Sequence, residues 1–133
     1  MLTQAQANRV AAMLNHVVDI PFLTEEMEQP LFENAVGLIV GNLASVLPEQ
    51  LRTIIGKYLN TSEEGLEEEN VPEFSDNLLR TLNKKLDIPL LGEEQEASIL
   101  GYFSDILGKG MMKGETFDKV LDVAELHTWK NDQ

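Results

Sequence analysis

The sequence predicts an all-α fold of about six helices, arranged as two similar three-helix halves in one bundle-like domain. Three observations lead to this prediction. Apolar residues recur at helical spacing along most of the 133 residues, the alternation typical of strands is not seen, and one segment occurs twice. We expect the two halves to pack about a pseudo-twofold axis.

The repeated segment spans residues 15–28 and returns at residues 83–96, an offset of 68 positions. Eight of its fourteen positions are identical, whereas unrelated sequences of ordinary composition share about one. Each copy contains an Asp-Ile-Pro turn followed by three glutamates. This pattern indicates an internal duplication, with half A at residues 1–60, an acidic connector at 61–72 and half B at 73–133.

Capping residues and prolines place the helices of half A. Thr3 and Gln6 form a Thr-x-x-Gln capping pattern, which predicts a first helix over residues 4–18. Thr24 can cap a second helix, whose interior contains Pro30. Because proline removes a backbone hydrogen bond, we expect either a kink at Pro30 or a helix that restarts there. Pro48 can open a third helix over residues 49–59.

Half B repeats this arrangement with small changes. Pro72 can open the fourth helix, and Gly92 stands where half A has the capping Thr24. The last helix is expected over residues 115–127, where the offset falls to 66 because the preceding glycine-rich turn is shorter. Trp129 is expected to fold back onto the bundle.

Composition is typical of one domain with its own core. Apolar residues make up 43% of the chain, which suffices for a core without disulfides, and cysteine is absent. The longest uncharged stretch, residues 34–48, is shorter than the roughly 20 apolar residues that a membrane span needs. The first residues lack the features of a secretory signal. We therefore expect a cytoplasmic protein that does not bind membranes.

The net charge of −13 limits the classes of partner. So much negative charge repels the phosphate backbone, which disfavours direct binding to nucleic acid or anionic lipid. The connector is the most acidic part of the chain. It is expected to be a solvated joint or, alternatively, a docking strip for a basic partner, or a mimic of DNA phosphates. Its carboxylates belong to Glu63, Glu64, Glu67, Glu68 and Glu69.

The repeated carboxylates suggest a second, less favoured hypothesis. Asp19 with Glu28, and Asp87 with Glu96, could supply pseudo-symmetric oxygen ligands to a hard divalent cation between the halves. The favoured interpretation of the two aspartates is structural, since an aspartate in a turn accepts backbone N–H groups. Neither segment has the ligand spacing of a calcium-binding helix–loop–helix.

No other pattern indicates catalysis. The two histidines, His16 and His127, lack the glutamate three positions earlier that a ferritin-like di-iron site requires. The glycine-rich segment 108–114 lacks the phosphate-binding pattern and follows a helix, and no serine lies in a nucleophile elbow. The sequence therefore favours a protein that is not an enzyme, and no cofactor is expected.

Small residues line one face of the second helix. Gly37, Gly41 and Ser45 recur every four positions, which lets another helix approach closely. Close packing within the chain is the favoured interpretation, and a homodimer contact is the alternative.

Three functions follow in order of preference. The first is a non-catalytic protein–protein interaction or assembly module that binds a basic surface. The second is a carboxylate-based cation-binding protein or enzyme with its site between the halves. The third is an acidic DNA mimic.

Overall fold

The chain folds entirely into helices within the part that the structure describes. The computed structural model describes residues 2–18, 20, 23–59, 61, 63–88 and 91–131, and their side chains except at Glu25 and at residues 127–131. The predicted packing of Trp129 lies outside these side chains. The described residues form six α-helices and one 3-10 turn, with no strand beyond an isolated bridge between Leu66 and Met112. The all-α prediction is confirmed.

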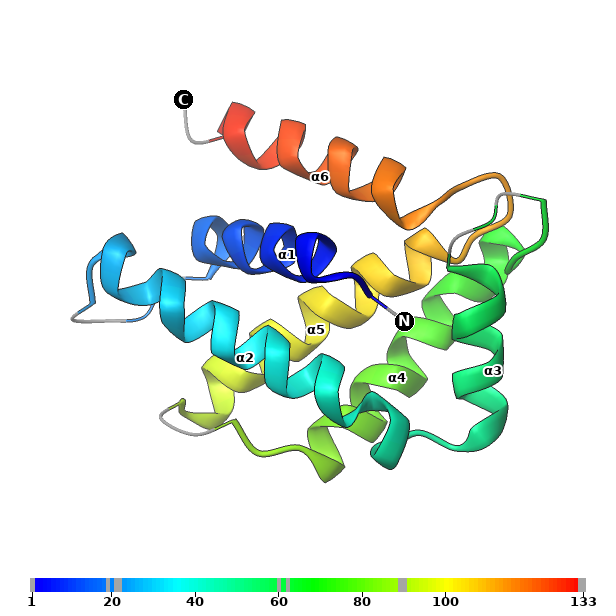
Figure 1. Cartoon of the computed structure of the whole chain (residues 1–133), viewed down its shortest axis with the longest axis horizontal. Helices are drawn as coiled ribbons and strands as arrows, with labels where there is room; N and C mark the ends of the chain where they lie inside the picture. Colours follow the sequence, from blue (N-terminus) through cyan, green and yellow to red (C-terminus); the bar gives the residue numbers. More distant parts are fainter. Residues whose placement is uncertain are drawn as a thin grey trace.

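The helices follow the predicted order along the chain (Figure 1). No described helix combines the length and the hydropathy needed to cross a bilayer. The elements are α1 (Gln4–Val17), α2 (Glu25–Val46), α3 (Glu49–Tyr58), η1 (Glu68–Asn70), α4 (Val71–Lys85), α5 (Glu93–Gly110) and α6 (Phe117–Asn131).

The predicted caps begin the helices. The N–H of Gln6 donates to Thr3 Oγ1 at 3.1 Å, and the Thr3 N–H donates to Gln6 Oε1 at 2.9 Å, which completes the capping box of α1. Thr24 caps α2 by accepting from the Met27 N–H. Gly92 occupies the same position before α5 with no side-chain cap. These three predictions are confirmed.

Helix α2 runs without interruption through Pro30, so the predicted restart at that residue is wrong. The missing N–H leaves the carbonyl of Glu26 without its helical partner. Both Glu26 and Pro30 are exposed, which places this defect on the water side of the helix. On the other side, Phe32 and Ile39 are fully buried, and their burial holds the helix in one piece.

Helix α6 begins two residues later than predicted. Thr116 precedes it, accepting from the N–H of Lys119 through its hydroxyl and from the N–H of Val120 through its carbonyl. The helix then continues past the predicted end at His127 to Asn131.

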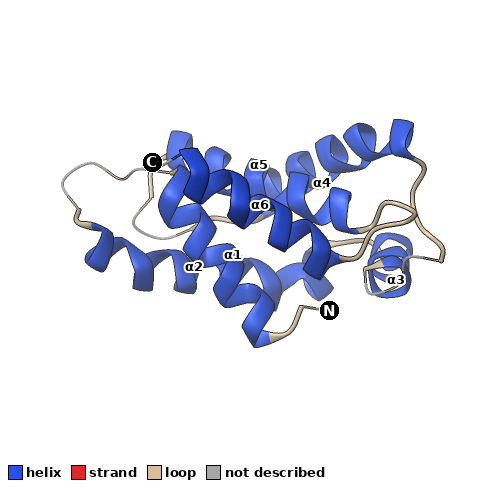
Figure 2. Ribbon diagram, turned by 90° about the horizontal axis from the view of Figure 1, so that it is seen from above, coloured by secondary structure: helices blue, strands red, loops and turns tan. Residues whose placement is uncertain are grey.

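Two antiparallel hairpins, α1–α2 and α4–α5, form the body of the molecule (Figures 1 and 2). Their facing sides bury one continuous apolar core. The largest fully buried side chains include Phe32, Phe103, Phe117, Met13, Leu14, Ile39, Leu43, Leu78, Leu82 and Ile99.

The third helix of each half packs differently. Helix α6 lies against both α1 and α5, whereas α3 makes only a small contact with α2 and lies at one end of the molecule in both views (Figures 1 and 2). The helices α3 and α6, which the sequence predicts as counterparts, therefore pack against different elements.

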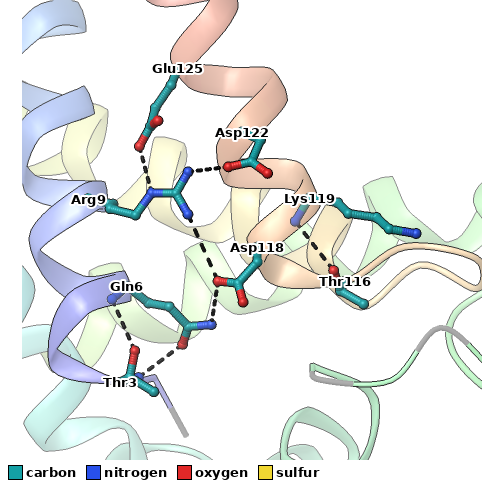
Figure 3. Close-up of polar contacts among 8 residues, drawn as sticks. All are labelled: Thr3, Gln6, Arg9, Thr116, Asp118, Lys119, Asp122 and Glu125. Atoms are coloured by element: carbon teal, nitrogen blue, oxygen red, sulfur yellow. Dashed lines mark hydrogen bonds and ion pairs between the residues drawn. The ribbon is translucent and has the colours of Figure 1, made fainter.

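Arg9 holds α6 against α1 (Figure 3). Its guanidinium lies 2.7 Å from Glu125, 2.6 Å from Asp122 and 4.0 Å from Asp118. The hydrogen bond to Glu125, followed by that to Asp122, raises the pKa of Arg9 above its usual value. Gln6 adds a bond from its Nε2 to Asp118 at 3.0 Å. One guanidinium of α1 thus contacts three carboxylates of α6.

Replacing Arg9 with methionine tests this attachment. The Arg9→Met variant keeps the apolar stem but leaves three carboxylates on α6 without a cation, so we expect a loss of about 1 kcal/mol in the free energy of unfolding. The loss should be smaller in about 1 M salt, because the Debye length is then roughly 3 Å and the ion pairs are largely screened. Urea denaturation measures both values. The control is Arg80→Met, since Arg80 is exposed and bonds only within α4; an equal loss there would contradict the assignment.

Candidate functional site

The two repeated turns are closed by buried glutamates. The N–H of Ile20 donates to Glu28 Oε1 at 3.0 Å, and the N–H of Ile88 donates to Glu96 Oε2 at 2.9 Å. The exposed fractions of Glu28 and Glu96 are only 1% and 8%. In each case a carboxylate in the first turns of a helix reaches back eight residues to the Ile of the preceding Ile-Pro pair.

The backbone around the two turns has the same hydrogen bonds. The N–H of Leu23 donates to the carbonyl of Ile20 at 3.3 Å, and the N–H of Leu91 donates to that of Ile88 at 3.4 Å. The residue before each helix is also alike, with φ −83° and ψ 163° at Thr24 and φ −74° and ψ 165° at Gly92.

The predicted cation ligands are distributed unequally. Asp19 lies outside the described residues, Asp87 is exposed, and Glu28 and Glu96 bind backbone N–H groups. The turn N–H groups were expected to bind the aspartates, whereas glutamates accept from Ile20 and Ile88; the identical spacing of these glutamates in both copies was the signal for this role. Among the described residues, no three carboxylate or histidine side chains are grouped to hold a metal ion. The cation site stays a prediction.

An open pocket of about 810 Å³ lies at the second turn. Asp87 and Glu96 both line it, together with Glu93, Glu94 and Lys84.

The acidic connector is fixed to the turn between α5 and α6. The N–H of Leu66 donates to the carbonyl of Met111 at 2.9 Å, and the N–H of Lys113 donates to the carbonyl of Leu66 at 2.8 Å. A Cβ on Gly65 would stand 2.4 Å from the Met111 carbonyl oxygen, so only glycine allows this approach. The connector is therefore a structured junction.

The connector presents its carboxylates to solvent. All five predicted interaction residues, Glu63, Glu64, Glu67, Glu68 and Glu69, are exposed. Lys57 lies 3.2 Å from Glu64, and their hydrogen bond raises the pKa of Lys57. No other ion pair to these five glutamates is present among the described residues.

An apolar groove of about 480 Å³ opens beside the connector. Its walls come from η1, α4, α5, the turn after α5, and α6. Apolar side chains line it, and one of them, Val123, is 54% exposed. These apolar residues are Val71, Pro72, Met112, Val120 and Val123.

Four carboxylate residues also line the groove. Glu68, Asp76, Asp105 and Glu115 line it together with one cation, Lys109. Lys109 pairs with Asp105 at 2.9 Å, one turn away on the same helix. Three groove carboxylates therefore lack a cationic partner among the described residues, and a fourth is neutralised locally. The groove could not be predicted from the sequence because its residues come from two stretches, 68–76 and 105–123, that meet only in the folded chain.

The small-residue face of α2 lies on the outside of the molecule. Gly37, Gly41 and Ser45 are exposed, and a Cβ on either glycine would meet no atom within 4 Å. The predicted close packing within the chain is therefore wrong, because the apolar face that packs is the one bearing Phe32, Ile39 and Leu43. The homodimer contact stays a prediction.

Comparison with known proteins does not add a function. No protein-family model, no curated protein and no solved structure matches this chain.

Removing a turn glutamate should destabilise the fold. In Glu96→Ala the Ile88 N–H loses its acceptor, so we expect unfolding to cost about 2 kcal/mol less, and a similar change for Glu28→Ala. Denaturant midpoints measure this. The control Glu94→Ala removes an exposed carboxylate from the first turn of the same helix, which is worth at most about 1 kcal/mol. Equal losses at Glu96 and Glu94 would contradict the structural role.

Adding one methyl group at Gly65 should loosen the connector. We expect Gly65→Ala to lose about 1–3 kcal/mol, because its Cβ collides with backbone atoms of Met111 and Lys113. Hydrogen exchange at the Leu66 amide should accelerate as well. The matched control is Gly56→Ala in α3, where the Cβ meets nothing and a gain of about 0.5–1 kcal/mol is expected. Unchanged exchange at Leu66 in Gly65→Ala would refute the close contact.

Proposed function

We propose that this protein is a non-catalytic interaction module that binds a basic surface of another protein through its acidic connector. The observation that carries the proposal is the attachment of the connector to the α5–α6 turn at Leu66. Because the backbone is held in place, the carboxylates on either side of Leu66 form a preorganised surface. Ordering costs on binding are lower for such a surface than for a free linker.

Electrostatics support this choice of partner. The connector contributes five of the 23 acidic residues within twelve positions, and among the described residues only Glu64 has a cation beside it. Uncompensated carboxylates attract a positively charged surface, raise its rate of association and repel acidic competitors. The apolar groove next to Glu68 offers contact area that exposed charges alone lack.

We also propose that the two hairpins are copies of one ancestral unit related by a pseudo-twofold. Support comes from the matched bonds of Glu28 with Ile20 and of Glu96 with Ile88, and from the matched helix starts at Thr24 and Gly92. In this proposal α3 and α6 diverged in their packing after the duplication. In this proposal the duplication produced the two hairpins, and the binding surface lies on the connector that joins them.

Neutralising the connector tests the proposed function. In a variant with all five connector glutamates changed to glutamine, we expect a fluorescent octalysine peptide to bind about five-fold more weakly at low salt. Fluorescence anisotropy measures the affinity at two salt concentrations.

The control variant removes the same amount of charge elsewhere. It carries Glu26→Gln, Glu33→Gln, Glu49→Gln, Glu93→Gln and Glu94→Gln, all at exposed positions, so its net charge equals that of the connector variant. It should bind octalysine nearly as well as the wild type. Equal weakening in both variants would show that the peptide senses only net charge, and the proposal would fail.

A further inference from the structure

We propose that the groove between α4, α5 and α6 binds an amphipathic, basic helix of a partner protein. This inference rests on the proposed function and names the class of partner segment. It is carried by two observations about the same cavity, namely its apolar lining and the four carboxylate residues that line it as well.

The apolar part of the groove has the form of a helix-binding surface. Val120 and Val123 are three residues apart on α6 and both line the groove, which places them on one face of that helix. Leu126 continues this spacing by another three residues and is 70% exposed. A row of side chains of this kind can pack into the groove between the side-chain rows of another helix.

The length of this stripe defines the length of the occupant. From Val120 to Leu126 the helix rises by about 9 Å, and Val71 and Met112 extend the apolar surface across the groove. An occupant of about three turns, with apolar residues on one face, would cover the stripe and fill the groove.

The charge of the groove selects a basic segment. Glu68, Asp76 and Glu115 all line the groove, so three carboxylates lie beside its apolar residues. A helix with lysine or arginine beside its apolar face would meet a carboxylate on each flank. An acidic or neutral helix in the groove would cover these three carboxylates without supplying a positive charge, which is unfavourable.

The connector and the groove form one continuous surface. Glu68 belongs to the connector and also lines the groove, so a basic segment seated in the groove would extend toward Glu67 and Glu69. The connector would then attract the partner over a distance, and the groove would hold it by apolar contact.

Designed peptides test the inference. The main probe is a peptide of about 12 residues with leucines at i, i+3, i+4, i+7 and i+11 and lysines elsewhere. A second peptide has the same composition in an order that spreads the leucines around the helix. We expect the patterned peptide to bind the wild-type protein about ten-fold more tightly than the scrambled one, as measured by fluorescence anisotropy.

Matched protein variants locate the binding. Val123→Gln should weaken binding of the patterned peptide about five-fold and leave the octalysine affinity unchanged. Val17→Gln is the control, because Val17 is similarly exposed, at 47%, but lies on α1 away from the groove. Both positions are at the surface, so both variants should keep the thermal midpoint of the wild type.

The outcomes separate this inference from the proposed function. If the patterned and scrambled peptides bind alike while octalysine still depends on the connector, the groove inference fails and the proposed function stands. If the patterned peptide depends on Val123 but neutralising the connector changes nothing, the proposed function fails. A homodimer that Val123→Gln abolishes, detected by sedimentation, would overturn the inference, because a second copy would occupy the groove.

Discussion

The fold depends on closing two sharp turns without leaving buried polar groups unpaired. Ile20 and Ile88 lie outside the helices, so their N–H groups have no helical carbonyl to bind. Glu28 and Glu96 supply the acceptors from within the following helices. An unpaired buried N–H costs about 1–3 kcal/mol, and a whole domain is stable by only about 5–15 kcal/mol. These two bonds therefore favour the observed closure of each hairpin.

A closed hairpin leaves one apolar face for the other hairpin to cover. Phe32, Leu43 and Ile39 from α2 and Leu78, Leu82 and Ile99 from the second hairpin are fully buried in one core. The remaining helices are attached by different means. Arg9 binds carboxylates of α6 across 116 positions of sequence, and the Leu59 carbonyl accepts from the N–H of Phe117 at the start of α6.

The acidic connector gains its order from this assembly. Leu66 bonds to the turn after α5, and that turn is shaped in part by Gly114, whose φ of +91° is accessible mainly to glycine. The same turn supplies Met112 and Glu115 to the groove. The turn after α5 therefore joins the acidic connector to the apolar groove.

The positions of the helices and of the two repeated segments could be predicted from the sequence. Capping by Thr3, Gln6 and Thr24 and the spacing of apolar side chains act within a few residues, so they can be read from local order. The roles of Glu28 and Glu96 became visible only in the folded chain, although each glutamate bonds to a residue just eight positions earlier. The exposed glycine face of α2, the different packing of α3 and α6, and the groove depend on which distant segments meet, and packing over the whole chain makes that choice.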